Sequence, residues 1–325
     1  MNQPPTFKKT RIAPTPSGFL HLGNVLSFSI TAALAGKAGA RILLRIDDID
    51  RERTDKRYVE DIFETLRYLG IPWDEGPKNF EEFQQEYSQV HRMGLYVTAL
   101  EELKATGQLF ACECSRTDIA RAGADGAYPG TCRQKKIALD KPEVAWRLRT
   151  DPVSLPPSMQ NFPPGIIDLP PSMKDFIVKR KDGFPAYQLT SLVDDRYFGV
   201  DGIIRGEDLW PSTQAQLYLS QLLPGHSPAN SSPVQEASPA HQAPRPFAKN
   251  YFHHHLLLPD ATGGKLSKSA GATSIQFLRK EGKSPKDIYS LIAEMLGSPA
   301  PVKDFIELAS ILEVPAHTIR YNAPP

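Results

Sequence analysis

Residues 10–50 constrain the fold of this chain more than any other stretch. Arg11–Ala13 is predicted to be a short strand, and a turn rich in proline, serine and glycine follows it. Apolar residues then recur at helical spacing over Leu22–Ala38, and Gly39 is suited to end that helix. Arg41–Ile46 is an apolar run typical of a buried parallel strand. A strand, a helix and a parallel strand form a βαβ unit, so we predict an α/β fold with a Rossmann-like, doubly wound parallel sheet.

The remaining sequence predicts how the chain is divided. We expect a first half of the sheet domain in residues 1–107, an insertion in residues 108–175, a second half in residues 176–270 and a short helical part in residues 271–325. Residues 56–70 and 81–107 are helical by pattern, and strand–helix alternation returns after Asp175. Pro224–Pro246 contains six prolines and few apolar residues, which indicates a loop.

Composition sets broad limits on location and partners. No apolar run approaches the roughly 20 residues that span a bilayer, and the N-terminal residues lack the apolar core of a signal peptide. A cytoplasmic location without membrane contact is therefore expected. The net charge of +1 neither requires nor excludes a nucleic-acid partner. The basic run Arg279-Lys280 with Lys283 and Lys286 fits a nucleic-acid surface or a solvated helix end.

The start of the first predicted helix has features of a phosphate-binding site. A helix start offers free backbone N–H groups and the positive end of the helix dipole. His21 and Asn24 lie three residues apart on the first turn and can face one ligand, and Gly23 lets a ring approach the backbone. A strand, a turn and a helix with one histidine also fit ordinary packing, so these residues alone leave both interpretations open.

The longer run from Thr10 to Asn24, Thr-Arg-Ile-Ala-Pro-Thr-Pro-Ser-Gly-Phe-Leu-His-Leu-Gly-Asn, allows a more specific interpretation. It resembles the signature of the glutamyl-tRNA synthetases and their relatives among the class I aminoacyl-tRNA synthetases. His21-Leu-Gly-Asn24 is similar to the HIGH motif of this class, with asparagine in place of the second histidine. The resemblance extends over about residues 10–270. It implies an enzyme that activates an amino acid with ATP, in which His21 and Asn24 bind the nucleotide.

A second motif, Lys265-Leu-Ser-Lys-Ser269, resembles the KMSKS loop of the same class. Without that resemblance, such a segment would be interpreted as a solvated loop. The resemblance implies that Lys265 and Lys268 bind ATP, and that Lys268 acts in catalysis together with His21. A lysine at this place would stabilise the negative charge that builds up on the phosphate oxygens during adenylate formation, typically by about 3–4 kcal/mol. Mg²⁺ is expected to accompany the ATP.

The resemblance further implies that the amino acid is L-glutamate. It assigns five residues to the glutamate pocket: Arg11, Thr15, Asp47, Tyr187 and Arg205. Arginines suit the carboxylates of this substrate, although surface arginines paired with Asp194 or Asp208 are an alternative. The family has glutamate where this chain has Asp47, whose carboxylate would hold the substrate ammonium. Aspartate is shorter by one bond, roughly 1.5 Å.

Three cysteines lie within a short stretch: Cys112, Cys114 and Cys132. An odd number of thiols argues against a disulfide framework and leaves reduced thiols or a metal site. Zinc prefers four ligands in a tetrahedron, and Tyr128 is close enough in sequence to supply an uncommon fourth one. The resemblance implies this ligand set, with one structural Zn²⁺ per chain. The run His253–His255 is more typical of a strand that leads to the lysine loop than of a metal site.

Only 56 residues follow Ser269, too few for the helical anticodon-binding region of a glutamyl-tRNA synthetase. This indicates a truncated branch of the family, which attaches glutamate to the queuosine base in the anticodon loop of tRNA(Asp). The expected partners are then ATP, L-glutamate and tRNA(Asp) or its anticodon stem-loop. Two alternatives stay open. One is a short glutamate–tRNA ligase that charges the tRNA 3′ end, and the other is a non-catalytic paralogue that binds nucleotide or tRNA.

Overall fold

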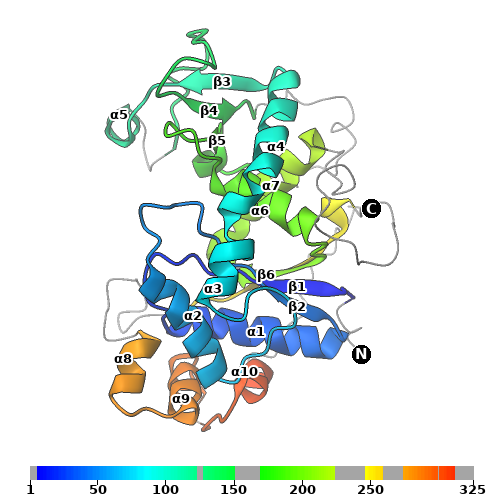
Figure 1. The fold of residues 1–325 in the computed structure, drawn as a ribbon, viewed down its shortest axis with the longest axis vertical. Coiled ribbons are helices and arrows are strands. Elements are labelled where there is room, and N and C mark those ends of the chain that lie inside the picture. Colours follow the sequence, from blue (N-terminus) through cyan, green and yellow to red (C-terminus); the bar gives the residue numbers. More distant parts are fainter. Residues whose placement is uncertain are drawn as a thin grey trace. The chain divides into compact units, whose positions relative to one another are not determined.

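The computed structural model describes residues 6–122, 127–150, 169–223, 246–258, 274–298 and 300–311. These residues form two compact units, which are described separately (Figure 1). Unit 1 contains the described residues of 6–91, 200–208 and 250–311, and unit 2 contains those of 92–199 and 209–249. Within the described part of the chain, no helix is long and apolar enough to cross a membrane.

Unit 1 is built on a four-stranded parallel sheet. Its strands are β1 (Lys9–Ile12), β2 (Arg41–Leu44), β6 (Gly202–Gly206) and β7 (Tyr251–His255). Their order across the sheet is β2-β1-β6-β7, and every pairing is parallel. The strand order reverses at β1, and open α/β sheets bind their ligands at such a reversal. The predicted α/β fold with a parallel sheet is confirmed.

Helix α1, Leu22–Ala38, joins β1 to β2 and completes the predicted βαβ unit. Nearly all of its apolar side chains are buried, which is expected of a helix that is covered on several sides. It contacts β1, β2 and β6 as well as α9 (Pro285–Met295) and α10 (Phe305–Ile311). The helix ends at Gly39, whose φ of 62° lies in the left-handed region that favours glycine.

The other helices of unit 1 are α2 (Lys56–Tyr68), α3 (Phe80–Glu82) and α8 (Ile275–Lys280). The single helix predicted over residues 81–107 is broken. A π-helical turn, η1 (Phe83–Tyr87), and a 3-10 turn, η2 (Gln89–Arg92), separate α3 from α4 (Met93–Ala105). The break occurs where the Ser88 hydroxyl and the Gln89 N–H both donate to the buried Asp48 carboxylate, which competes with helical hydrogen bonds.

Unit 2 contains a separate antiparallel sheet. Its three strands are β3 (Leu109–Cys112), β4 (Ala145–Leu148) and β5 (Ile177–Lys179), in that order. The strand expected after Asp175 therefore exists as β5. It pairs with β4, however, and does not extend the parallel sheet. Strand direction could not be predicted here, because residues 109–112, 145–148 and 177–179 are each too short to show a clear period.

Four helices accompany this antiparallel sheet: α4, α5 (Arg116–Ala122), α6 (Tyr187–Tyr197) and α7 (Trp210–Leu222). Short 3-10 turns lie at Pro171–Met173 (η5), Glu207–Leu209 (η6) and Phe247–Lys249 (η8). A buried ion pair joins the start of α4 to α6. The Arg92 guanidinium donates to both Asp194 oxygens at 2.9 and 3.1 Å, and the Tyr96 hydroxyl donates to the same carboxylate at 2.7 Å. Removing one partner of such a pair leaves an unpaired buried charge.

Candidate functional site

His21 caps the start of α1. Its Nδ1 accepts the Gly23 N–H at 3.1 Å, and the Asn24 side-chain oxygen accepts the His21 N–H at 3.0 Å. The two residues assigned to ATP thus lie together, as their spacing predicted, and both also serve the helix as a capping box. The His21 ring folds over Gly23, where an added Cβ would lie 3.1 Å from ring atoms. A larger residue at this position would require the His21 ring to shift by a few tenths of an ångström.

The segment that follows the lysine loop returns to this helix start. His21 forms an antiparallel bridge with Ser274, and the Ile275 N–H donates to the Leu20 carbonyl at 2.8 Å. Lys265 and Lys268 lie in residues 259–273, outside the described part of the chain. Ser274, the first described residue after residues 259–273, is therefore fixed beside His21. Sequence reasoning missed Ser274 because an isolated bridge of two residues leaves no pattern in the sequence.

Asp61 of α2 supports the same helix start. Its Oδ2 accepts the Leu20 N–H at 2.9 Å, and burial raises the pKa of this carboxyl. Asp61 is only 3% exposed and stands among the buried apolar residues Val59, Ile62 and Leu66. A charged residue on the apolar face of an amphipathic helix was the signal in the sequence that could have identified it.

Arg11 and Arg205 project from the same face of the parallel sheet. Thr10 pairs with Gly202, and successive side chains of a strand point to opposite faces of the sheet. Arg11 is one residue after Thr10 and Arg205 is three residues after Gly202. Both arginines therefore lie on the face opposite to that of Thr10 and Gly202. The alternate residues Ile12 and Ile204 face the apolar core on the α1 side. Arg11 donates from Nη1 to the Ile204 carbonyl at 3.2 Å and therefore reaches across to β6.

Both arginines are buried, at 5% and 4% exposed. They are not surface arginines, and Asp194, one of the alternative partners, is bound by Arg92. His254 is the neighbour of Arg205 on β7. Burial, followed by the positive charges of Arg205 and its other neighbours, lowers the pKa of His254 to about 3. Arg11, Arg205 and His254, hereafter the sheet-end cluster, therefore form a positively charged environment that favours a bound anion.

Asp47 lies just beyond β2 and is bound by Arg45. The Arg45 Nε donates to Oδ1 at 2.7 Å and Nη2 donates to Oδ2 at 3.0 Å, with both side chains buried. Two charge-assisted hydrogen bonds thus hold the Asp47 carboxylate in one orientation. Thr15, also assigned to glutamate, is exposed in the turn after β1, where its carbonyl accepts the Ser17 N–H.

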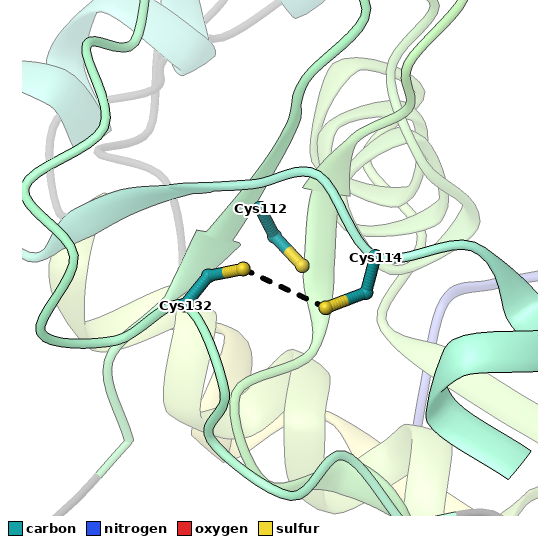
Figure 2. A group of neighbouring side chains, drawn as sticks. All are labelled: Cys112, Cys114 and Cys132. Carbon is teal, nitrogen blue, oxygen red and sulfur yellow. Dashed lines mark hydrogen bonds between the residues drawn. The ribbon is translucent and has the colours of Figure 1, made fainter. Parts of the chain in front are cut away.

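The three cysteines converge on one point. Figure 2 shows the sulfurs of Cys112, Cys114 and Cys132 directed toward one another, and all three lie within 4.8 Å of each other. The Cys114 and Cys132 sulfurs are 3.5 Å apart. The Tyr128 hydroxyl accepts the Cys132 N–H at 2.8 Å and is hydrogen-bonded to the Cys112 side chain. The predicted set of four residues is thus brought together.

The acid–base properties of the cluster fit a divalent cation. Burial and the neighbouring sulfurs raise the pKa of Cys114 to about 12, because two adjacent thiolates repel each other. Burial also raises the pKa of Cys112, but hydrogen bonds from Tyr128, the Cys114 backbone and Arg147 outweigh it and leave that pKa below its usual value. A cation between the sulfurs would remove the repulsion and favour the thiolates. The three cysteines can therefore hold a metal ion.

Tyr187 is the first residue of α6 and belongs to unit 2, whereas Arg11, Asp47 and Arg205 belong to unit 1. Its side chain is 38% exposed. It lines a cavity of about 270 Å³ within unit 2, whose wall also includes Tyr128 of the cysteine cluster.

Comparisons with known proteins agree with this geometry. The family model for tRNA synthetases class I (E and Q), catalytic domain, matches residues 8–230. A glutamyl-Q tRNA(Asp) synthetase of Symbiobacterium thermophilum is 35% identical, over 96% of this chain and 95% of its own length. A protein of the same name from Nitratidesulfovibrio vulgaris is 33% identical, over 95% and 94%. A glutamate–tRNA ligase 2 of Nitrosococcus oceani is 31% identical, and the chain spans 62% of its length.

The solved structures agree at the level of the fold. The glutamate–tRNA synthetase of Elizabethkingia anophelis superimposes with a TM-score of 0.64 at 23% identity, covering 94% of this chain and 66% of that structure. At this identity the likeness concerns the fold alone. The family match and the nearly full-length relatives go further, and the chain belongs to the class I tRNA synthetases of the glutamate and glutamine type.

Proposed function

We propose that this protein activates L-glutamate with ATP to form glutamyl-adenylate, and transfers the glutamyl group to the queuosine base in the anticodon loop of tRNA(Asp). The observation that carries the proposal is the arrangement of unit 1. One parallel sheet presents a buried pair of arginines, Arg11 and Arg205, and its first helix is capped by His21, which forms a bridge with Ser274. A carboxylate site and a phosphate site on one sheet are what adenylate formation needs.

In the first reaction, a carboxylate oxygen of glutamate attacks the α-phosphorus of ATP. A bond forms between that oxygen and phosphorus, the bond to the β-phosphate oxygen breaks, and pyrophosphate leaves. We assign the nucleotide to His21, Asn24, Lys265 and Lys268, and Mg²⁺ would accompany the phosphates. Lys268 would stabilise the charge that develops on the phosphate oxygens, and a bridge to His21 fixes Ser274 at the helix start.

The amino acid would be held by Arg11, Thr15, Asp47, Tyr187 and Arg205. The sheet-end cluster supplies the positive charge for a carboxylate, and the Asp47 carboxylate, which Arg45 holds in place, would accept the substrate ammonium. Asp47 is shorter than the glutamate of the family, but Arg45 donates to both of its oxygens and holds the carboxylate in one orientation. This pair favours an ordered ammonium site in spite of the missing methylene.

The names of the relatives support the queuosine base as the acceptor. Proteins that match over 94–95% of their own length are called glutamyl-Q tRNA(Asp) synthetases, whereas the chain spans only 62% of a similar glutamate–tRNA ligase. That second similarity favours charging of the tRNA 3′ end as the second candidate function.

The cysteine cluster would hold one structural Zn²⁺. Cys112, Cys114 and Cys132 would supply three thiolates and Tyr128 the fourth ligand, which leaves no open position for a reacting molecule. Zinc would then fix the loop around residues 112–132 and would take no part in the chemical step. One Zn²⁺ per chain in purified protein is the expected result of elemental analysis.

Two assays test the proposal. Glutamate-dependent pyrophosphate exchange should occur in the wild type and be lost in Lys268→Ala; no exchange with any amino acid would leave the non-catalytic alternative. Labelled glutamate should then be offered with tRNA(Asp) that contains or lacks queuosine, and with tRNA(Glu). Label that depends on queuosine supports the proposal. Equal labelling of both tRNA(Asp) samples, or labelling of tRNA(Glu), supports charging of the 3′ end.

A further inference from the structure

Asp61 is a buried carboxylate in the middle of α2. Its side chain is 3% exposed, and the nearby residues Val59 and Ile62 of the same helix are at most 1% exposed. Charged residues are rarely buried to this degree unless they are paired. Within the described part of the chain, however, no salt bridge reaches Asp61, and its hydrogen-bond partners are the Leu20 N–H and the Thr65 hydroxyl. An ion pair therefore does not account for its burial.

The backbone of Leu20 is held at both of its polar groups. The Leu20 N–H donates to Asp61 Oδ2 at 2.9 Å, and the Leu20 carbonyl accepts the Ile275 N–H at 2.8 Å. The next N–H along the chain, that of His21, donates to the Asn24 side-chain oxygen at 3.0 Å. Both polar groups of the peptide bond between Leu20 and His21 are thus used. The orientation of His21 therefore depends on the groups that hold Leu20.

A second contact attaches the same turn to α2. The Phe19 ring packs edge-on against the Tyr58 ring, with the ring centres 4.9 Å apart. Tyr58 lies three residues before Asp61, so the two side chains are neighbours on the surface of the helix. α2 holds the residues before His21 by an aromatic contact and by a hydrogen bond. The hydrogen bond is the more directional of the two, because it weakens steeply when its angle changes.

α2 also holds the start of α8. Ser274 caps α8 and forms the bridge with His21, and Ile275 is the first residue of that helix. α8 contacts α2, and its Arg279 guanidinium lies 3.1 Å from the Glu64 carboxylate of α2. One helix therefore supports the turn before α1 and the segment that meets this turn at Leu20 and His21.

We propose that Asp61 is a positioning residue for ATP use, which sets the place of His21 and Ser274 through the backbone of Leu20. The proposal rests on the proposed function, in which His21 binds the nucleotide. Asp61 acts as a fixed hydrogen-bond acceptor. An apolar residue in its place would leave the Leu20 N–H without this partner, and the turn would shift to satisfy it. A displacement of about 1 Å at a reacting site can change a rate about 100-fold.

Asp61→Ala and Asp61→Asn separate this role from a contribution to stability alone. Alanine removes the acceptor, whereas asparagine keeps an oxygen of the same reach and can donate to the Thr65 hydroxyl. In glutamate-dependent pyrophosphate exchange, we expect the KM for ATP to rise about tenfold in Asp61→Ala, with an unchanged KM for glutamate. Asp61→Asn should stay close to the wild type. A loss of folded protein lowers the apparent kcat and changes neither KM, so the KM for ATP is the decisive measurement.

Ile62→Ala, in the same helix, is the matched control. Ile62 is 1% exposed, so this substitution leaves a cavity in the core and destabilises the fold. The Ile62 side chain has no polar atom that could hold Leu20, and we expect the KM for ATP of this variant to stay at the wild-type value.

Ile275→Pro makes the same test if Asp61→Ala does not fold. It removes the N–H that donates to the Leu20 carbonyl, at a first helical position that proline suits. Ser274 has φ of −72° and ψ of 142°, which is the extended conformation that a residue before proline adopts. The KM for ATP should rise in this variant as well, again without a change in the KM for glutamate.

An unchanged KM for ATP in Asp61→Ala, or in Ile275→Pro where that variant replaces it, would overturn the proposal. An equal rise in Ile62→Ala, or no recovery in Asp61→Asn, would overturn it as well. Equilibrium binding of ATP without glutamate distinguishes this failure from that of the proposed function. If the wild type lacks exchange but its Kd for ATP depends on Asp61, the proposed function fails and the positioning role stands. A wild type that binds no ATP overturns both.

Discussion

At the scale of single residues, burial decides how the charged groups of unit 1 can act. Arg11 and Arg205 are removed from water and lie beside a histidine that resists protonation. Charges in such a place are not screened as they are at the surface, so their interaction with a carboxylate is strong. Each buried charge also affects the stability of the fold. Its effect on stability and its effect on substrate binding therefore have to be measured separately.

Arg205→Lys should weaken glutamate use more than folding. The variant keeps the charge but loses the planar, two-pronged donor geometry that fits a carboxylate. We expect kcat/KM for glutamate in pyrophosphate exchange to fall about 10- to 100-fold, equivalent to roughly 1.4–2.7 kcal/mol, while the KM for ATP changes little. Arg41→Lys, at an arginine whose side chain is 63% exposed, is the matched control and should stay close to the wild type. An unchanged KM for glutamate in Arg205→Lys would contradict the assignment.

Asp47→Asn should lower the free energy of unfolding, so its effect on stability has to be measured before any effect on substrate binding is interpreted. It removes the negative charge that pairs with the buried Arg45 guanidinium. Losses of about 3–5 kcal/mol are typical for such a change, and urea unfolding followed by circular dichroism measures it. Asp50→Asn, in the more exposed pair with Arg53, should cost less than about 1 kcal/mol. Equal effects of the two substitutions would show that the Arg45–Asp47 pair is not stabilising.

At the scale of elements, local patterns predicted α1 and its two flanking strands well. Both the helix stop at Gly39 and the run Arg41–Ile46 depend on neighbours in sequence, so they can be read without the fold. The antiparallel sheet of unit 2 could not be predicted, because its strands pair over long separations and have three or four residues each. The pairing of Arg45 with Asp47 was also missed, since two residues of spacing do not show that both side chains are buried.

Strand β7 makes stability depend on pH. Burial lowers the pKa of both His254 and His255, and in the unfolded chain each histidine returns to an ordinary pKa near 6.5. The unfolded chain then binds more protons than the folded one below that pH. This part of the stability is fully present above pH 6.5 and is lost as pH falls, by at most about 1.4 kcal/mol per pH unit for each histidine.

Urea midpoints at pH 7.5, 6.5 and 5.5 measure this effect. His254→Gln should lose less stability between pH 6.5 and 5.5 than the wild type, because one titrating group is gone. His91→Gln, at an exposed histidine outside β7, is the matched control for the substitution itself. A wild-type midpoint that does not fall over this range would refute the expectation.

The cysteine cluster should stabilise unit 2 only with its metal ion. Cys132→Ser removes a buried ligand, and we expect the zinc content to fall well below one per chain with a clear drop in melting temperature. Glutamate-dependent exchange should fall less than transfer to tRNA, since the cysteine cluster belongs to unit 2 and the residues of unit 1 that we assign to ATP are not part of it. Exchange and transfer that fall in parallel would argue against this division of roles.

At the scale of the whole molecule, the described residues pass between the two units four times, near residues 91, 199, 208 and 249. β6 is the short stretch of unit 1 that both precedes and follows long stretches of unit 2. Each unit is therefore assembled from segments that are distant in sequence, and bringing them together closes a loop that contains residues of the other unit.

We expect one cooperative unfolding transition as a result. Trp73 reports on unit 1 and Trp146 on unit 2, and variants that keep only one of these tryptophans allow each to be followed by fluorescence. The two urea midpoints should coincide with each other and with circular dichroism. Midpoints that differ between the two probes would show that the units unfold independently.

The position of β6 also limits how such a gene can be shortened. A single deletion that excised unit 2 as one block would take β6 with it, and β1 and β7 would lose the strand that lies between them. Segments outside the sheets can change in length without this effect. Neither unit is one continuous segment of the sequence. Two cuts in the chain therefore cannot separate one unit from the other as an independent module.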